Sequence, residues 1–227
     1  MMIYYTNDSR KVEFTPTGEP MGSGTQGSVY DFGANKCIKI YGDNVTKYRP
    51  EIFTLFKELS LDGYCKLYDL LYVDPNMQEV AGYIMQKYIN EVDNILNMPT
   101  EYTLNSFNIL YNSIKLLADN RIFARDTLPN NAILSRDNIV LIDFDTCDYS
   151  TLPSERILTV NTSNILYLFK RLFKDGLDKM GKNTNDDELS DYLDYLFAYS
   201  SEPIKTLQRR MAYSKTPMDV LPYKYRY

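Results

Sequence analysis

The sequence predicts an α+β fold in which a small strand-rich N-terminal part precedes a mostly helical C-terminal part. Residues 22–41 read as strand, turn and strand, with glycines at the turns. Residues 132–142 hold two short apolar runs around a polar turn, which is typical of a buried hairpin. From residue 103 onward, apolar residues recur mainly with the spacing of amphipathic helices. At 227 residues, the chain is long enough for one large domain or two small lobes.

Composition excludes several classes of function. The chain has no histidine, which removes Ser-His-Asp hydrolysis, Cys-His proteolysis and histidine-ligated zinc. A formal net charge of −5 argues against a nucleic-acid partner, which normally needs a basic surface. No apolar run approaches the length of a membrane span, and the polar start lacks a signal-peptide core. The three cysteines form no pairing motif, so we expect reduced thiols in a cytoplasmic setting.

A glycine-rich segment begins at residue 22 and reads Gly-Ser-Gly-Thr-Gln-Gly-Ser-Val-Tyr, the pattern Gly-x-Gly-x-x-Gly-x-Val. Glycines let backbone amides approach and bind phosphate oxygens, although the same residues also suit a flexible hairpin turn. A dinucleotide-binding fold would need a helix directly after these glycines. Here a turn at residues 33–35 and a second apolar run at 36–41 follow instead, which favours a hairpin.

Lys39 lies in that second run, between Ile38 and Ile40. Residues 50–59 then carry apolar side chains at i, i+3, i+4 and i+7, the stripe of a helix that begins at Pro50. This helix bears two carboxylates, Glu51 and Glu58. Residues 80–89 read as a buried strand that runs into an extended connector.

The segment 125–146 places Asp126 and Asn131 before the predicted hairpin and Asp143 after it. A hairpin of this kind would hold the three oxygen-bearing side chains at the mouth of one cleft. Carboxylate and amide oxygens without histidine or cysteine suit a hard cation such as Mg²⁺, which is usually bound by one or two carboxylates plus substrate phosphates.

Taken together, these segments resemble the protein kinase superfamily over nearly the whole chain. Its pattern is a glycine-rich loop, a strand lysine, a helix glutamate, His-Arg-Asp-x-x-x-x-Asn and Asp-Phe-Gly. The resemblance implies a two-lobed fold within a single domain, 1–227, with an N-lobe at 1–87 and a C-lobe at 88–227. It also implies an ATP- and Mg²⁺-dependent transfer of phosphate to Ser or Thr hydroxyls of a protein substrate, as in the small kinases that bacteria deploy as effectors into a host cytoplasm.

The resemblance assigns roles to individual residues. Asp126 would orient or deprotonate the acceptor hydroxyl, and Asn131 and Asp143 would hold Mg²⁺. Lys39 would contact the α and β phosphates, held by Glu51, with Glu58 as the rival partner. The nucleotide would be bound by Gly22, Ser23, Gly24, Thr25, Gln26, Gly27, Val29 and Lys39, with adenine at a connector that includes Gln86 and Tyr88.

The chain departs from the family pattern at four points. Ala124 replaces the His of His-Arg-Asp, and Leu128 stands where Ser/Thr kinases usually place a lysine that meets the transferred phosphate. Asp145 replaces the Gly of Asp-Phe-Gly. Residues 153–155 could stand in for Ala-Pro-Glu, but they follow Asp145 so closely that a long, phosphorylation-controlled loop cannot fit between them. Arg125 therefore need not have a phosphate to pair with.

Two other functions compete with a protein kinase. The missing lysine after Asp126, the Ile142-Asp-Phe-Asp145 run and the short segment after it favour a small-molecule kinase of the aminoglycoside or choline type. Arg125 before the Asp and the small C-terminal part argue against that type. A nucleotide-binding pseudokinase that acts as a scaffold is the third interpretation. The sequence leaves the oligomeric state open.

Four further helical segments complete the C-terminal part. Residues 103–120 form a strongly amphipathic stretch. A capped helix is predicted from Thr162 to Phe173, ending near Gly176. After a polar loop at 179–187, a helix around residues 189–197 and a last helix at 202–213 are expected.

Overall fold

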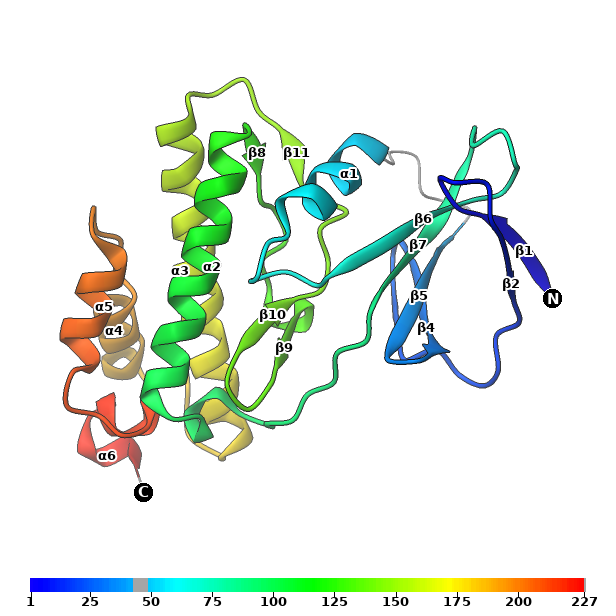
Figure 1. Ribbon diagram of the computed structural model, residues 1–227. Helices are drawn as coiled ribbons and strands as arrows, with labels where there is room; N and C mark the ends of the chain where they lie inside the picture. The colour runs from blue at the N-terminus through cyan, green and yellow to red at the C-terminus, as the bar shows by residue number, and fades with distance from the viewer. Residues whose placement is uncertain (43–48, 227) are drawn as a thin grey trace. The chain divides into compact units, whose positions relative to one another are not determined.

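The computed structural model of the protein describes residues 1–42 and 49–226 (Figure 1). Its chain divides into two compact units. Unit 1 comprises 1–61 and 65–88, and unit 2 comprises 62–64 and 89–227. The fold is α+β, with an antiparallel sheet in unit 1 and helices that dominate unit 2.

Unit 1 is built on one seven-stranded sheet in the order β2-β1-β6-β7-β5-β4-β3, with every neighbouring pair antiparallel. Its core cluster draws residues from five strands, such as Phe14, Ile38 and Ile84. Helix α1 (Pro50–Leu59) begins at Pro50, as predicted, and buries Ile52, Phe53 and Phe56. The strands are β1 (Met2–Tyr5), β2 (Lys11–Phe14), β3 (Gly22–Gly24), β4 (Gly27–Gly33), β5 (Lys36–Tyr41), β6 (Leu67–Tyr72) and β7 (Val80–Gln86).

Unit 2 is organised around two long helices that run side by side, α2 (Thr100–Asp119) and α3 (Ser154–Lys179) (Figure 1). Phe107 of α2 meets Phe169 of α3 edge to face, with ring centroids 5.3 Å apart. The helix predicted at 103–120 is confirmed, and it begins three residues earlier. The later helices are α4 (Asp187–Leu196), α5 (Pro203–Met211) and α6 (Tyr223–Arg226), with short 3-10 turns η1 (Ile95–Asn97), η2 (Pro129–Asn131) and η3 (Pro217–Val220).

Short strands complete unit 2. The predicted hairpin is confirmed as β9 (Ala132–Leu134) paired antiparallel with β10 (Ile139–Leu141). Two further strands, β8 (Ile122–Phe123) and β11 (Asp148–Tyr149), also pair antiparallel. Residues 62–64 join this unit because the Leu141 amide donates to the Gly63 carbonyl at 3.0 Å.

The helix predicted to run from Thr162 to near Gly176 is wrong at both ends. Helix α3 begins at Ser154 and continues to Lys179, so Thr162 lies in its interior, and Gly176 does not end it. The Gly176 carbonyl accepts a hydrogen bond from Asn94 Nδ2 at 2.9 Å, and a Cβ on Gly176 would lie 2.2 Å from Asn94 Oδ1. This glycine therefore serves close packing rather than a helix terminus. The predicted last helix is also not last, because α6 follows it.

All three cysteines are buried, and none of them forms a disulfide within the described residues. Burial raises the pKa of Cys147 to about 12, aided by the carboxylates of Asp143 and Asp145. Burial, followed by the Asp31 carboxylate, raises the pKa of Cys37 to about 11. At neutral pH both thiols are therefore protonated and weakly nucleophilic.

We expect a thiol reagent such as 5,5′-dithiobis(2-nitrobenzoate) at pH 8 to leave the native protein unlabelled and to label all three cysteines after denaturation. The pKa of Cys147 in the folded protein lies above the reference value of 9.0. The stabilisation that comes from keeping this thiol protonated is therefore fully present below pH 9 and is lost progressively between pH 9 and about pH 12. Replacing Cys147 with alanine should make alkaline unfolding, followed by circular dichroism, less steep. Rapid labelling of the native protein would contradict the buried placement.

Across residues 1–42 and 49–226, no helix has both the length and the apolar character that a membrane crossing requires.

Candidate active site

The predicted site residues fall in both units. In unit 1, the glycine-rich segment forms the hairpin of β3 and β4, in which Gly24 pairs with Gly27 across a two-residue turn. Ser23 and Ser28 face each other with their hydroxyls 3.0 Å apart. At the tip, the side-chain oxygen of Gln26 is buried and accepts no hydrogen bond within the described part of the chain.

The glycines of this hairpin differ in what surrounds them. A Cβ on Gly27 would lie 2.1 Å from the Ile40 carbonyl oxygen, so only glycine fits against β5. Around Gly22 and Gly24, by contrast, a Cβ would have no neighbour within 4 Å among the described residues. Local packing therefore requires Gly27, whereas the space beside the other two glycines is open.

These surroundings lead to a prediction for two alanine variants. Gly27→Ala should destabilise the protein by about 1–3 kcal/mol through overpacking against β5. Gly24→Ala should leave the unfolding midpoint near that of the wild type but weaken ATP binding, because the new methyl group obstructs approach to the loop. Thermal unfolding and a fluorescent-nucleotide titration check both. If Gly24→Ala binds ATP as the wild type does, the loop does not hold the phosphates.

Lys39 lies in β5 and is only 6% exposed. It pairs with Val29 of β4 and with Tyr83 of β7, so these three residues form a row across the sheet. Its ammonium nitrogen lies 5.7 Å from the ring centroid of Tyr83 and 5.9 Å from that of Tyr41. Strand pairing and the two rings thus fix the position of a buried cation.

The two candidate partners of Lys39 are both exposed. Glu51 lies in the first turn of α1 and Glu58 in its last turn. The helix is tied to the sheet instead by Lys57, whose Nζ lies 3.6 Å from the Asp69 carboxylate. Within the described residues, neither glutamate makes a hydrogen bond or ion pair through its side chain. The structure thus does not show Lys39 paired with Glu51 or Glu58, and this pairing stays a prediction.

The predicted adenine-binding connector begins at the end of β7. The Gln86 amide donates to the Lys66 carbonyl at 2.8 Å, and the Lys87 amide donates to the Asn35 carbonyl at 2.9 Å. Both amides are thus used within unit 1, which leaves the Gln86 side chain and the backbone from Tyr88 onward for a nucleotide. Tyr88 is half-buried, and this burial raises the pKa of its phenol.

In unit 2, Asp126 and Asn131 belong to one tightly bonded turn. Asp126 has a φ of +56°, in the left-handed region that Asp tolerates better than most residues. Its carbonyl accepts hydrogen bonds from the Leu128 amide at 2.9 Å and from Asn131 Nδ2 at 3.0 Å. These bonds hold the backbone at the exposed Asp126 in one conformation, with its carboxylate accessible to solvent.

The same turn contacts the segment that carries Asp143. The carbonyl of Asn131 accepts a hydrogen bond from the Ile142 amide at 2.9 Å, which places Asp143 next to the buried Asn131. Asp143 Oδ1 accepts from the Asp145 amide at 3.1 Å, so Asp145 fills the Gly position of the motif as part of a turn. The structure therefore brings the turn of Asp126 and Asn131 against the segment of Asp143, as the hairpin prediction required.

The donor set is small for a metal. In the described parts of the chain, no group of three or more His, Cys, Asp or Glu could hold a metal ion. However, Asn131 Nδ2 is bound to the Asp126 carbonyl, which leaves its Oδ1 as an available ligand beside Asp143. One amide oxygen and one carboxylate fit Mg²⁺ when phosphates complete its coordination.

Two asparagines of α3, one on each side of Thr162, hold the backbone of the segment that leads into Asp126. Asn161 of α3 is fully buried; its Oδ1 accepts from the Ala124 amide at 2.9 Å and its Nδ2 donates to the Ile122 carbonyl at 3.2 Å. Asn164 Nδ2 donates to the Ala124 carbonyl at 2.9 Å. The i, i+3 spacing of Asn161 and Asn164, which places both on one face of a helix, is the signal that could have identified them. Ala124, at the motif's His position, is thus held through its backbone.

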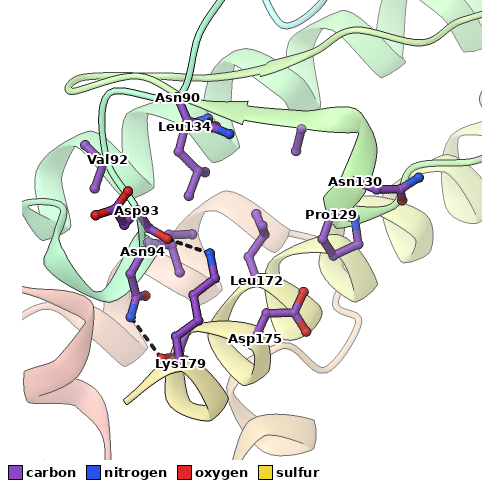
Figure 2. Close-up of a pocket in the computed structure, with 13 residues that line it drawn as sticks. Asn90, Val92, Asp93, Asn94, Pro129, Asn130, Leu134, Leu172, Asp175 and Lys179 are labelled. Carbon is purple, nitrogen blue, oxygen red and sulfur yellow. Dashed lines mark hydrogen bonds between the residues drawn. The ribbon is translucent and has the colours of Figure 1, made fainter. Parts of the chain in front are cut away.

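A cavity of about 360 Å³ in unit 2 borders the same loop (Figure 2). On one side Pro129 and Asn130 line it, and on another side Lys179 donates to the Asp93 carbonyl at 2.8 Å. Apolar contributions come from residues such as Leu134 and Leu172. The full lining is Asn90, Val92, Asp93, Asn94, Ile95, Pro129, Asn130, Ala132, Leu134, Leu172, Asp175, Gly176 and Lys179.

Comparison with known proteins finds similarity in structure but not in sequence. No protein-family model matches the chain, and no curated protein matches it in sequence. Among solved structures, it is similar to the Legionella pneumophila Lpg2603 kinase bound to IP6, with 16% sequence identity and a TM-score of 0.45. The match covers 84% of this chain and 77% of that chain. The case for a function therefore rests on the residues of the two units.

Proposed function

We propose that the protein is an ATP- and Mg²⁺-dependent phosphotransferase of the protein kinase type. The observation that carries the proposal is the turn of unit 2, where Asn131 binds the Asp126 carbonyl through its side chain and the Ile142 amide through its backbone. The contacts that hold the turn together thereby bring three groups close to one another: the exposed carboxylate of Asp126, the side-chain oxygen of Asn131 and the carboxylate of Asp143. The buried lysine of β5 and the open glycines of β3 support the same function from unit 1.

Each residue has a separate task in the proposed reaction. The Asp126 carboxylate orients the acceptor hydroxyl and takes its proton as the oxygen forms a bond to the γ-phosphorus. The bond from the γ-phosphorus to the β–γ bridging oxygen breaks, and ADP leaves. Asn131 and Asp143 would hold Mg²⁺, which would neutralise charge on the phosphates. Lys39 binds the α and β phosphates, so none of these steps needs a histidine.

The acceptor we favour is a Ser or Thr hydroxyl of a protein, because the glycine-rich and Arg-Asp-x-x-x-x-Asn patterns match protein kinases. A small-molecule acceptor is the second candidate, and two observations favour it. Helix α3 begins at Ser154, so only eight residues separate it from Asp145 and no long activation loop is present. The 360 Å³ cavity beside Pro129 and Asn130 also has a volume suited to a small ligand.

Mass spectrometry can separate these functions. The protein is incubated with Mg·ATP, alone, with cell lysate, or with a panel of amines and polyols, and protein masses and ADP are measured. Phosphate added to Ser or Thr of lysate proteins supports the first acceptor. ADP that forms only with a small molecule supports the second. If the protein binds ATP but forms no more ADP than a Lys39→Met variant does, the proposed enzymatic activity is wrong and a nucleotide-binding scaffold is the remaining function.

A further inference from the structure

A basic depression of about 500 Å³ lies in unit 2, within the last 17 residues that the structure describes. It is bounded by the end of α5, the turn that follows it, η3 and α6. Three cationic side chains line it, those of Arg210, Lys215 and Arg226, against the single carboxylate of Asp219. An excess of positive charge in one hollow is notable in a chain whose formal net charge is −5.

The carboxylate in this depression is already engaged. Asp219 Oδ2 accepts hydrogen bonds from the amides of Lys215 at 3.0 Å and Thr216 at 2.9 Å, forming the capping box of η3. In the part of the chain that the structure describes, no ion pair links Asp219 to any of the three cations. Three cations therefore face one carboxylate, which interacts with Arg226 through its charge but forms no ion pair with it.

The two arginines are held by neutral groups. Arg210 Nη1 donates to the carbonyls of Leu196 at 2.8 Å and Ala198 at 3.3 Å, and its guanidinium lies 4.8 Å from the ring centroid of Tyr195. Arg226 Nε donates to the Leu221 carbonyl at 2.7 Å. Both side chains are half-buried. Carbonyl bonds fix the guanidinium groups without neutralising them, so their other N–H groups remain free to bind an anion at little entropic cost.

We propose that this depression binds a small phosphate-bearing anion. Guanidinium groups present forked N–H donors that match phosphate oxygens, and two arginines with a lysine from separate segments suit an anion of more than one charge. The volume admits more than a single phosphate group. This inference does not depend on the proposed phosphotransferase activity, because none of these residues belongs to the candidate active site.

Calorimetric titration with inorganic pyrophosphate in low salt tests the proposal. We expect a Lys215→Gln/Arg226→Gln variant to bind about tenfold more weakly than the wild type or worse, since two charge-assisted contacts are lost. The matched control is Lys205→Gln/Arg209→Gln. It removes the same charge from the exposed face of α5, where both side chains pair with Glu202. This control should bind like the wild type. A Lys39→Met background, which weakens the nucleotide site, should keep the binding that Lys215→Gln/Arg226→Gln removes, and this would separate the depression from the nucleotide site.

Three results would overturn the proposal. The first is the absence of a heat of binding at millimolar pyrophosphate. The second is an equal loss of affinity in Lys205→Gln/Arg209→Gln and in Lys215→Gln/Arg226→Gln, and the third is complete loss of pyrophosphate binding in Lys39→Met. Because Arg226→Gln removes the bond to Leu221, the single variant Lys215→Gln is measured as well. In the described residues the Lys215 side chain has no hydrogen bond or ion pair, so its loss should not affect folding. Unchanged affinity in Lys215→Gln, with an unfolding midpoint like that of the wild type, would likewise contradict a site that uses this cation.

Discussion

Replacing Asp126 with asparagine is expected to lower the rate of phosphoryl transfer by roughly 10²- to 10⁴-fold, the range typical of a lost general base. Asparagine also tolerates the left-handed backbone at this position, so the bonds from Leu128 and Asn131 to the residue 126 carbonyl should persist. The affinity for ATP should change little, because Asp126 acts on the acceptor hydroxyl. Initial rates of ADP release and a nucleotide titration check the two expectations.

Asp137 provides the matched control for this substitution. It is exposed in the turn between β9 and β10, so Asp137→Asn makes the same chemical change within the same hairpin. The control should keep the activity of the wild type. An Asp126→Asn protein that is as active as the control would remove Asp126 from the mechanism, although ATP binding by the glycine-rich loop could still be correct.

Replacing Asn161 with alanine is expected to be among the most destabilising single changes in unit 2. The substitution leaves the Ala124 amide and the Ile122 carbonyl without their partner inside a fully buried region. Each unsatisfied group costs about 1–3 kcal/mol, so the free energy of unfolding should fall by roughly 2–6 kcal/mol. For a chain of this size, that corresponds to a decrease of roughly 5–20 °C in Tm. Calorimetry or thermal circular dichroism measures the change.

Ser163→Ala is the control for Asn161→Ala, because Ser163 lies on the exposed face of the same helix. Within the described residues, its hydroxyl donates only to the Thr159 carbonyl. We expect it to stay close to the wild-type Tm. At temperatures where Asn161→Ala remains folded, its transfer rate should also fall, since the segment that leads into Asp126 loses its anchor. A Tm equal to that of Ser163→Ala would mean that the two bonds of Asn161 contribute little.

The parts of the fold that the sequence predicted well depend on local signals. Helix α1 occupies the predicted residues because Pro50 sets its start and the apolar stripe sets its buried face. The hairpin of β9 and β10 follows from two apolar runs that flank a turn. The proximity of Asp126, Asn131 and Asp143 was predictable for the same reason, because a short hairpin returns the chain to its starting point.

What the sequence could not show depends on packing between distant segments. Thr162 and Gly176 have the residue types of helix ends, but tertiary contacts bury the first and pack the second against Asn94. The role of Asn161 could not be read locally, since its partners lie 37 and 39 residues earlier in the chain. The basic depression likewise needs three segments, none of which carries a basic run that stands out in the sequence.

The glycines on either side of β5 have a consequence for saturation mutagenesis. A Cβ on Gly82 would lie 1.9 Å from the Lys39 carbonyl oxygen, and one on Gly27 would lie 2.1 Å from the Ile40 carbonyl oxygen. Two adjacent peptide groups of β5 are therefore closely approached by the backbones of both neighbouring strands. In a library screened only for protein abundance, both positions should therefore reject every other amino acid. Positions 22 and 24 should tolerate many replacements in that screen and become restrictive only when nucleotide binding is selected.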